Sequence, residues 1–392
     1  MINWMIENGG TLLMKVVIAM DSLKGCLSSI EAGNAVKQGI LSVMPDTKII
    51  VSPLADGGEG TTDSLIEKLG GQRINLQVTG PLGNPISAYY GYLKEKKTAV
   101  IEMATAAGLT LIPKGKRNPF RATSFGVGEM IQDAICHGCR KFIIGIGGSA
   151  TNDGGLGMLK ALGFLFLDKN KKDVGEGAQA LSKIEFISSQ NANPFLKNCE
   201  FHIACDVNNP LYGPNGATYI YGPQKGVTEN MKAFLDSSMI HYAKKTEQFT
   251  GTQFSNIPGS GAAGGIGFAF LSYLNAVLTP GIDLILEATD LEKEIQNSDI
   301  VITGEGKIDH QTAMGKAPFG VARLAKKHGA IVIAFAGTIT SDAAICNEAG
   351  FDAFFPILRG PSTLEEAMNP KNAKENLSAA VQQVFRLISA KK

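Results

Sequence analysis

Short hydrophobic runs alternate with amphipathic segments at both ends of this 392-residue chain. Near the N-terminus, residues 15–20 (KVVIAM) and 48–54 are expected to form strands, because each is a short apolar run flanked by polar residues. Between them, Ser28 and Glu31 have the spacing of a capping box, which predicts a helix that ends by Pro45. A second helix is expected after the second strand. Alternating strands and helices predict an α/β fold.

The same alternation returns in the last quarter of the chain. Residues 300–302 predict a buried strand, the polar stretch 303–312 is expected to be a loop, a helix begins near Pro318, and residues 331–336 predict the next strand. Together these elements form a βαβ unit. Its polar loop follows the carboxyl end of the first strand, which is where open α/β sheets bind their ligands.

The middle of the chain has a different pattern. Three strands are expected between residues 73 and 103, a helix at 124–136, further strands at 141–146 and 201–207, and a glycine-rich segment at 259–267 that begins another helix. Several consecutive strands without intervening helices predict a mixed sheet.

We therefore predict a doubly wound, flavodoxin- or Rossmann-like parallel-sheet domain that is interrupted by a second, mixed α/β domain. The first domain would comprise residues 14–68 and 290–392, with about five strands and with helices on both faces. Residues 69–289 would form the inserted domain, and residues 1–13 an N-terminal extension. Small molecules often bind between domains, so the ligand is expected in the cleft between these two.

Charge and composition narrow the classes of partner. The formal net charge is +1 and no basic patch stands out, so no nucleic-acid partner is expected. No hydrophobic run reaches transmembrane length and the N-terminus lacks the features of a signal peptide, so we expect no membrane partner and a cytoplasmic location. Cys136 and Cys139 form a CxxC, but no second pair follows at zinc-site spacing. The oligomer that we consider for this protein is a homodimer.

Four glycine-rich segments carry the candidate chemistry: 56–61, 147–157, 259–267 and 303–309. Glycines allow backbone N–H groups to approach phosphate oxygens closely. Several carboxylates accompany them, and these would repel phosphates unless a divalent cation bridges the two; Mg²⁺ binds through one or two carboxylates together with substrate phosphates. The acids are Asp56, Glu59, Asp153, Glu305 and Asp309. The four segments together therefore favour metal–nucleotide binding, although any one of them alone is more often only a tight turn.

Known nucleotide motifs match poorly. Gly145-x-Gly147-x-x-Ala150 follows a strand like a dinucleotide fingerprint, but the residues after it do not resemble the first turn of a packed helix. Gly315-Lys316 is followed by Ala317 rather than Ser or Thr, so no P-loop is present. This excludes P-loop folds but not phosphoryl transfer.

Five longer stretches resemble the bacterial type I glycerate kinases. They are 21–25 (DSLKG), 55–61 (ADGGEGT), 147–155 (GGSATNDGG), 204–211 (ACDVNNPL) and 303–312 with its TGEG, Asp309, Gln311 and Thr312. They occur in the family's order and cover nearly the whole chain from Met14, and the N-terminal extension is the departure from the family pattern. Five motifs in register are far more specific than any one of them.

The resemblance implies ATP-dependent phosphorylation of D-glycerate, with Mg²⁺, by a two-domain α/β protein that closes over its substrate. It favours 2-phosphoglycerate as the product over 3-phosphoglycerate, because bacterial members of this type mostly resemble 2-kinases. The residues themselves do not separate the two hydroxyls. Lys24 would bind the glycerate carboxylate or the transferring phosphate, Asp56 and Asp206 would serve as metal ligand or base, and Glu305 and Asp309 would form a second acid pair.

On this basis each predicted site residue has a role. The catalytic residues would be Lys24, Asp56, Asp206 and Asp309. The metal ligands would be Asp56, Glu59 and Glu305. Substrate hydroxyls and phosphates would contact Ser22, Gly57, Gly58, Thr61, Gly148, Ser149, Asn152, Asp153, Asn208, Gly264, Gly304, Gln311 and Thr312.

Two other function classes remain open from the residues alone. A nicotinamide-dependent hydroxy-acid dehydrogenase would suit a doubly wound domain and the segment at Gly145, and it predicts changes in nicotinamide absorbance with glycerate. A two-lobed, non-enzymatic binding protein would share the cleft but would not need acids in its glycine-rich loops. Release of ADP from ATP in the presence of glycerate separates the kinase from both.

Overall fold

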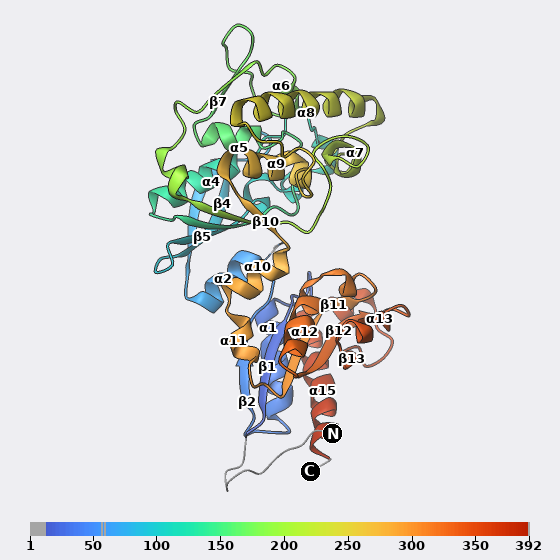
Figure 1. Ribbon diagram of the computed structural model, residues 1–392. Helices are drawn as coiled ribbons and strands as arrows, with labels where there is room; N and C mark the ends of the chain where they lie inside the picture. Colours follow the sequence, from blue (N-terminus) through green and yellow to red (C-terminus); the bar gives the residue numbers. More distant parts are fainter. Residues whose placement is uncertain (1–12, 56–57, 59, 391–392) are drawn as a thin grey trace. The chain divides into compact units, whose positions relative to one another are not determined.

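The computed structural model describes residues 13–55, 58 and 60–390 (Figure 1). The chain forms two compact units and passes from one to the other at residues 56–57 and 284–285. The first unit combines the N-terminal stretch with the chain from Ile285 onward, and the second is the segment that ends at Leu284. The domain boundaries predicted from the sequence, after residues 68 and 289, stay a prediction.

The first unit is built on a five-stranded parallel sheet with the order β13-β12-β11-β1-β2. Numbered within this unit, the order is 5-4-3-1-2, which is the flavodoxin-like arrangement of doubly wound sheets. The predicted fold class is thereby confirmed. The strands are β1 (Lys15–Met20), β2 (Lys48–Val51), β11 (Ile300–Ile308), β12 (Ile331–Ile339) and β13 (Ala353–Pro356).

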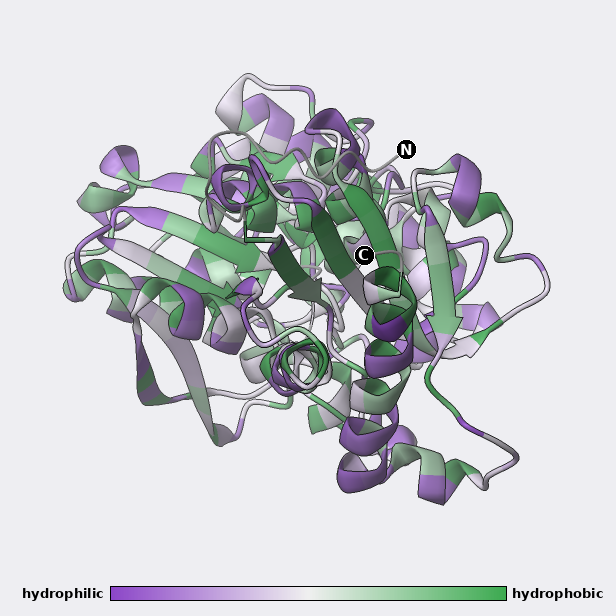
Figure 2. Cartoon of the chain, turned by 90° about the horizontal axis from the view of Figure 1, so that it is seen from below, coloured by the Kyte–Doolittle hydropathy of each residue, from purple (hydrophilic) through white to green (hydrophobic). Residues whose placement is uncertain are grey.

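Helices cover both faces of this sheet. Val16, Ile18 and Met20 pack with α1 and α15 in one hydrophobic core, because alternate strand residues face the same side. On the other face, α12 lies against β11 and β12 (Figure 1). Figure 2 shows hydrophobic strands in the middle of the sheet and hydrophilic outer sides on the helices. The helices are α1 (Ser29–Leu41), α10 (Gly281–Ala288, across the boundary), α11 (Leu291–Ile295), α12 (Ala317–Lys327), α13 (Ile345–Glu348), α14 (Leu364–Met368) and α15 (Pro370–Ser389).

The second unit contains a six-stranded mixed sheet with the order β10-β9-β6-β5-β4-β3. Its first four strands are parallel, whereas β4 and β3 run antiparallel to their neighbours. A separate antiparallel pair is formed by β7 and β8. The strands are β3 (Gln72–Thr79), β4 (Pro85–Leu93), β5 (Thr98–Glu102), β6 (Lys141–Gly145), β7 (Leu165–Leu167), β8 (Phe186–Ser188), β9 (Glu200–Ala204) and β10 (Val277–Thr279).

One large hydrophobic core holds this unit together. It joins the inward side of the sheet to α4, α5, α8 and α9, with Phe142, Met239 and Phe270 among its fully buried side chains. Fully burying such a side chain contributes roughly 1.5–3 kcal/mol. The helices are α2 (Thr61–Leu69), α3 (Ala104–Ala107), α4 (Phe125–Cys136), α5 (Leu156–Ala161), α6 (Ala178–Leu181), α7 (Ala217–Tyr221), α8 (Glu229–Thr250) and α9 (Ala262–Leu274).

The largest difference from the predicted elements is in the polar stretch after residue 302. It was expected to be a loop, but β11 continues to Ile308 and pairs Lys307 with Thr338 of β12. A glycine is needed at position 304 of this strand, because a Cβ there would lie 2.0 Å from the carbonyl oxygen of Phe335. The glycine therefore permits close strand packing rather than a turn.

Other differences are smaller. The strand expected at 201–207 ends at Ala204. The helix after the glycine-rich segment 259–267, which we expect from the sequence to run to about Leu278, ends at Leu274. The 22-residue helix α8 had no counterpart among the predicted elements, although its buried residues Leu235, Met239 and Tyr242 have helical spacing.

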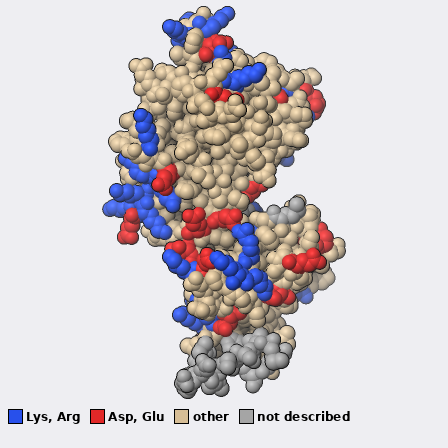
Figure 3. All heavy atoms as spheres, in the orientation of Figure 1, with Lys and Arg blue, Asp and Glu red and all other residues tan. Residues whose placement is uncertain are grey.

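In the described part of the chain, no helix has both the length and the hydrophobicity needed to cross a bilayer. Acidic and basic side chains are mixed on the face shown in Figure 3.

Candidate active site

The carboxyl ends of β1 and β11 meet at the point where the strand order of the first unit reverses. Met20 pairs with Gly304, and the N–H of Asp21 donates to the carbonyl of Gly304 at 2.9 Å. Ligands of doubly wound sheets bind outside the carboxyl ends of the strands at such a switch point. After β1 the chain turns tightly, and the exposed Lys24 lies in this turn; its backbone nitrogen is 3.9 Å from where a Cβ on Gly306 would lie.

Two carboxylates lie at the carboxyl end of β11, one in the strand and one directly after it. Glu305 is buried, and its Oε1 accepts a hydrogen bond from the Thr312 hydroxyl at 2.7 Å. Asp309, also buried, accepts from the backbone N–H of Gln311 at 3.0 Å, while its own N–H donates to the Thr312 hydroxyl at 3.2 Å. The Thr312 hydroxyl therefore links the Glu305 carboxylate to the backbone of Asp309.

Two lysines accompany these acids. Lys307 Nζ lies 3.0 Å from Asp309, and Lys316 Nζ lies 3.6 Å from Asp309 and 3.4 Å from Glu305. Lys316 immediately precedes α12, after a short 3₁₀ turn (η5, Thr312–Met314). The local chain thus places two acids and two cations around one strand end.

The environments of the two acids differ in their effect on ionisation. Burial raises the pKa of Glu305, and the Thr312 hydroxyl and Lys316 only partly offset this. Burial also opposes ionisation of Asp309, but Lys307 and Lys316 together hold the pKa of Asp309 below its usual value. Neighbouring acids whose pKa values are pushed apart are typical of acid–base sites, because one stays ionised while the other protonates more readily.

A second group of predicted residues follows β6 in the other unit. Gly147 and Gly148 are exposed, and Gly148 has a left-handed backbone (φ +69°). Ser149 behind them is buried, and its hydroxyl accepts a hydrogen bond from Lys225 at 2.7 Å. Sequence reasoning missed Lys225, because it lies 76 residues from Ser149 in a segment without a recognisable motif.

Asp153 lies at the end of the same loop and is fully buried. It accepts from the backbone N–H and the hydroxyl of Ser124 at 2.9 and 2.8 Å, and from the N–H groups of Gly155 and Gly157 at 3.2 Å each. These donors tie the start of α5 to the start of α4. Burial raises the pKa of Asp153, and the four donors oppose this effect.

The glycine-rich segment 259–267 packs against this loop. Gly264 has φ +73°, and a Cβ there would lie 2.0 Å from the carbonyl oxygen of Thr151. In addition, the Gly154 N–H donates to the Gly264 carbonyl at 2.9 Å. The structure therefore brings together Gly148, Ser149, Asn152, Asp153 and Gly264, which the sequence places in two distant segments.

The loop after β9 lies beside the loop after β6, since Gly145 pairs with Ala204 in the sheet. Asp206 and Asn208 are exposed there. Asp206 Oδ1 accepts from the N–H of Gly281 at 2.8 Å, which caps the start of α10. A negative charge at the N-terminus of a helix also stabilises the helix by interacting with the helix dipole.

The segment before α2 has an unexpected partner. Glu102, at the end of β5, accepts from the N–H groups of Gly60 and Thr62 at 3.3 and 2.7 Å. Its carboxylate thus occupies the helix N-terminus that was expected to bind phosphate. Gly58 and Thr61 lie in this segment, and the predicted residues Asp56, Gly57 and Glu59 lie outside the described residues.

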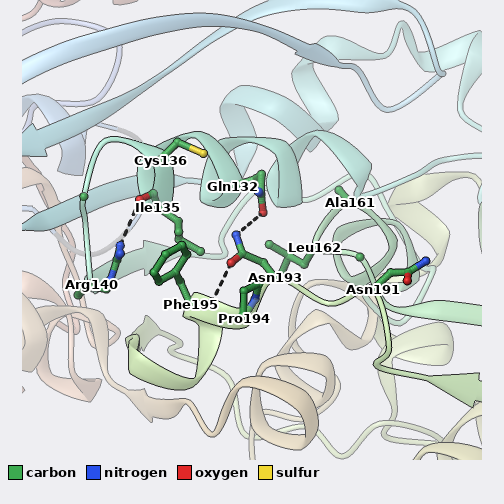
Figure 4. A pocket seen from close by; sticks show the side chains of 12 residues that line it. Gln132, Ile135, Cys136, Arg140, Ala161, Leu162, Asn191, Asn193, Pro194 and Phe195 are labelled. Carbon is green, nitrogen blue, oxygen red and sulfur yellow. Dashed lines mark hydrogen bonds between the residues drawn. The ribbon is translucent and has the colours of Figure 1, made fainter.

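Two hollows in the second unit are lined by none of the predicted residues. One pocket of about 560 Å³ lies between the end of α4 and residues 191–195 (Figure 4). Gln132 and Asn193 are hydrogen-bonded there at 2.9 Å, and Arg140 donates to the Ile135 carbonyl at 3.1 Å. The dinucleotide-like segment at Gly145 does not lead into a helix, because α5 begins only at Leu156.

Residues 16–389 match the model of the glycerate kinase family. The chain belongs to this family. It is 48% identical to the glycerate kinase of Bacillus subtilis over 354 residues, which cover 90% of this chain and 93% of the relative. It is 44% identical to the glycerate 2-kinase of Escherichia coli over 367 residues, covering 94% of this chain and 96% of that one.

A solved structure agrees with this assignment. The crystal structure of a protein described as a glycerate kinase 2 from Salmonella typhimurium LT2 matches with a TM-score of 0.90 and 41% identity, covering 97% of this chain and 99% of that one. The family resemblance that the five motifs indicated is confirmed, and the α/β architecture is that of a glycerate kinase.

Proposed function

We propose that this protein is a glycerate 2-kinase, which transfers the γ-phosphoryl group of ATP to the 2-hydroxyl of D-glycerate and yields 2-phosphoglycerate and ADP. The family supports a phosphotransferase acting on glycerate, and the Escherichia coli relative carries the name glycerate 2-kinase. Transfer to the 3-hydroxyl is the alternative that the product analysis below separates.

The observation that carries the proposal is the acid pair at the switch point between β1 and β11. Phosphoryl transfer needs positioning, charge neutralisation and one group that accepts the hydroxyl proton. Asp309 is suited to accept that proton, since Lys307 and Lys316 keep its carboxylate ionised. The same lysines, with Lys24 in the adjacent turn, would neutralise negative charge on the transferred group.

The residues around Glu305 fit a magnesium ion. Within residues 13–55, 58 and 60–390 there is no cluster of three or more His, Cys, Asp or Glu side chains arranged for a metal. Mg²⁺ in kinases needs fewer, because waters and substrate phosphates complete its coordination. One oxygen of the buried Glu305 carboxylate, Oε2, accepts a long hydrogen bond from Lys316 at 3.4 Å. Glu305, with the predicted ligands Asp56 and Glu59, would hold the ion, which neutralises charge on the ATP phosphates.

The second unit would hold the groups of the substrates that do not react. Ser149 and Asn152 supply a hydroxyl and an amide behind the exposed Gly147–Gly148 backbone, and Asn208 follows the neighbouring strand. We assign these residues to substrate hydroxyls and anionic oxygens. Asp206 is assigned as a second catalytic acid beside the cap of α10. Because the reaction consumes ATP, we place the enzyme in the cytoplasm.

One assay tests the proposal. The full-length protein is incubated with Mg-ATP and D-glycerate, ADP release is followed, and the product is examined by phosphorus and proton NMR. We expect glycerate-dependent ADP and a phosphate that couples to the C2 proton. Coupling to the C3 protons would replace the 2-kinase by a 3-kinase, and absence of ADP release from folded protein would refute the kinase. L-Glycerate serves as the matched control substrate.

A further inference from the structure

Lys225 has a side chain that is 2% exposed, at the end of a short 3₁₀ turn (η4, Pro223–Lys225). Its Nζ donates to the Ser149 hydroxyl and to the carbonyl of Thr151, both at 2.7 Å. Lysine is almost never fully buried unless it is paired. The position of this ammonium beneath the loop after β6 therefore needs an explanation.

No carboxylate lies within ion-pair distance of Lys225 in the part of the chain that the structure describes. Asp153 acts on it only at longer range, and the Asp153 oxygens already accept from Ser124, Gly155 and Gly157. Burial lowers the pKa of Lys225 to about 7, and the charge of Asp153 opposes this shift. A buried cation without an adjacent counter-ion is unfavourable unless an anion arrives from elsewhere.

The geometry above Lys225 gives the direction from which an anion arrives. The Ser149 oxygen accepts the hydrogen bond from Lys225, so the hydrogen of the Ser149 hydroxyl is free to point to a ligand. Outward of Ser149, the backbone of Gly147 and Gly148 is exposed. Backbone N–H groups of a glycine-rich loop, a hydroxyl donor and a cation behind it together form an anion site.

The loop after β6 is tightly packed, and it contains buried polar atoms without hydrogen-bond partners among the described residues. Gly264 packs from another side against Thr151, whose carbonyl accepts from Lys225, and Ala263, Gly264 and Gly265 all have left-handed backbones. Buried Thr151 Oγ1 and Asn152 Oδ1 lack hydrogen-bond partners within the described residues. Unpaired buried polar groups and strained backbone gather at ligand sites, where the surroundings over-determine them.

We propose that Lys225 is a positioning residue for an anionic oxygen of a substrate bound at Gly148–Ser149, that it orients the Ser149 hydroxyl as a donor, and that it takes up a proton when this anion binds. This inference rests on the proposed kinase function and deepens it by assigning a residue that the family motifs do not include. The anionic oxygen belongs to the carboxylate of glycerate or to a phosphate of ATP, and the experiment distinguishes these two sources.

The proton uptake follows from linkage. In the free enzyme the pKa of Lys225 is about 7, so above that pH the amine is mostly neutral. An anion bound beside Ser149 favours the charged form and raises the pKa, so binding draws a proton from solution. Affinity for the anion is then full below about pH 7 and falls by up to tenfold per pH unit above it.

Other charged or titratable groups lie around Lys225. Asp153, in the loop after β6, carries the charge that opposes the lowering of the Lys225 pKa. Arg117 donates to the carbonyl of the neighbouring Gln224 at 2.9 Å. Tyr221 is the last residue of α7, and burial raises the pKa of its phenol, which keeps it neutral.

Isothermal titration calorimetry on the full-length protein tests the proposal. D-Glycerate and ATP without metal are titrated separately at pH 8, in buffers with different ionisation enthalpies, which reports protons taken up per ligand bound. We expect uptake of a large fraction of one proton with one of the two ligands. Uptake with glycerate assigns the carboxylate, and uptake with ATP assigns a phosphate. Uptake with neither ligand overturns the proposal.

Variants separate this role from a purely structural one. Lys225→Met should weaken that ligand at least tenfold at pH 7 and abolish the uptake, whereas Lys225→Arg should keep the affinity but lose its pH dependence, because arginine stays charged. Ser149→Ala should weaken the same ligand while leaving Lys225 in place. Lys232→Met, on the nearby α8, is the matched control and should change neither quantity.

The outcomes also distinguish the two proposals of function. Folded Lys225→Met with wild-type affinity and uptake overturns the role of Lys225, while ADP release with glycerate stays intact. Absence of ADP release from the folded wild type overturns the kinase and this inference with it. If Lys225→Met does not fold by circular dichroism, the wild-type uptake and the Ser149→Ala affinity decide.

Discussion

The two units both bury charge behind the carboxyl end of a parallel strand, but they do so in opposite ways. At the end of β11, Glu305 and Asp309 are surrounded by Lys307 and Lys316, so that charges neutralise within the unit. Behind the loop after β6, Lys225 has no such neighbour among the described residues. The first arrangement places lysines beside both acids and suits proton transfer. The second leaves one positive charge uncompensated and suits anion binding.

The strongest test of this comparison is removal of the proposed base. Asp309→Asn keeps the shape and loses the charge, so we expect kcat to fall by about 10²–10⁴, with KM for D-glycerate little changed. Steady-state kinetics at saturating Mg-ATP measure both constants. Asp342→Asn, an exposed acid next to His310, is the control. A kcat near that of the wild type would remove Asp309 from the chemistry.

The packing of the second site gives the next largest effect. Gly264→Ala would add a Cβ 2.0 Å from the Thr151 carbonyl, at a residue with φ +73°. We expect a loss of roughly 2–4 kcal/mol in the free energy of unfolding. Urea denaturation measures it. Gly251→Ala shares the left-handed backbone but meets no neighbour within 4 Å, so it should cost only about 1 kcal/mol. Equal losses in both variants would show that the close contact is unimportant.

Asp206 tests whether the second unit also contributes an acid to the reaction. Asp206→Asn retains a side chain that can cap α10, whereas Asp206→Ala loses both cap and charge. We expect kcat to fall about tenfold or more in both, in line with a charged catalytic group, and only the alanine variant to lose about 1 kcal/mol of stability. An asparagine variant with full activity would reduce Asp206 to a helix cap.

The lysines beside Asp309 should set the acid limb of the rate profile. Lys307 lowers the pKa of Asp309, so Lys307→Met raises it, and the loss of kcat on acidification begins at a higher pH. The profile of kcat against pH measures the shift. The shift is toward higher pH because a general base acts only when it is deprotonated, and it is mostly deprotonated only above its pKa. An unmoved acid limb would mean that another group limits the rate.

The smallest expected effect concerns a charge that is not among the predicted site residues. Glu31 completes the capping box of α1, and its contacts with Lys374 and Ser28 lower the pKa of Glu31 to about 2. Glu31→Gln keeps the capping geometry, so we expect a loss of at most about 1 kcal/mol in the free energy of unfolding at pH 7, since the pair is partly exposed. A depressed pKa stabilises above the unfolded value, near 4.3, and the benefit fades as pH falls toward 2. A difference that persists at pH 2 would contradict this.

Much of the fold was predictable because local rules and hydrophobic runs agree. The capping box at Ser28, the apolar runs of β1 and β12 and the left-handed Gly70 after α2 all mark element ends directly. The extension of β11 was not, since TGEG has the composition of a turn and only the pairing with β12 makes it a strand. Lys225 and Glu102 were missed for a related reason. Their partners lie 76 and 40 residues away, and no local pattern encodes such contacts.

The location of Glu305 on a strand has a consequence for how the chain can change length. Side chains alternate between the two faces of a sheet, so a one-residue deletion between Ile300 and Gly304 would turn Glu305 from the α12 face toward the hydrophobic core against α1 and α15. A two-residue deletion would restore its face but shift it along the strand by roughly 7 Å. The side of the sheet on which Glu305 lies therefore depends on the number of residues that precede it in β11. We expect insertions and deletions to be tolerated in the turn after β1 and beyond Ile308, and not within the strand before Glu305.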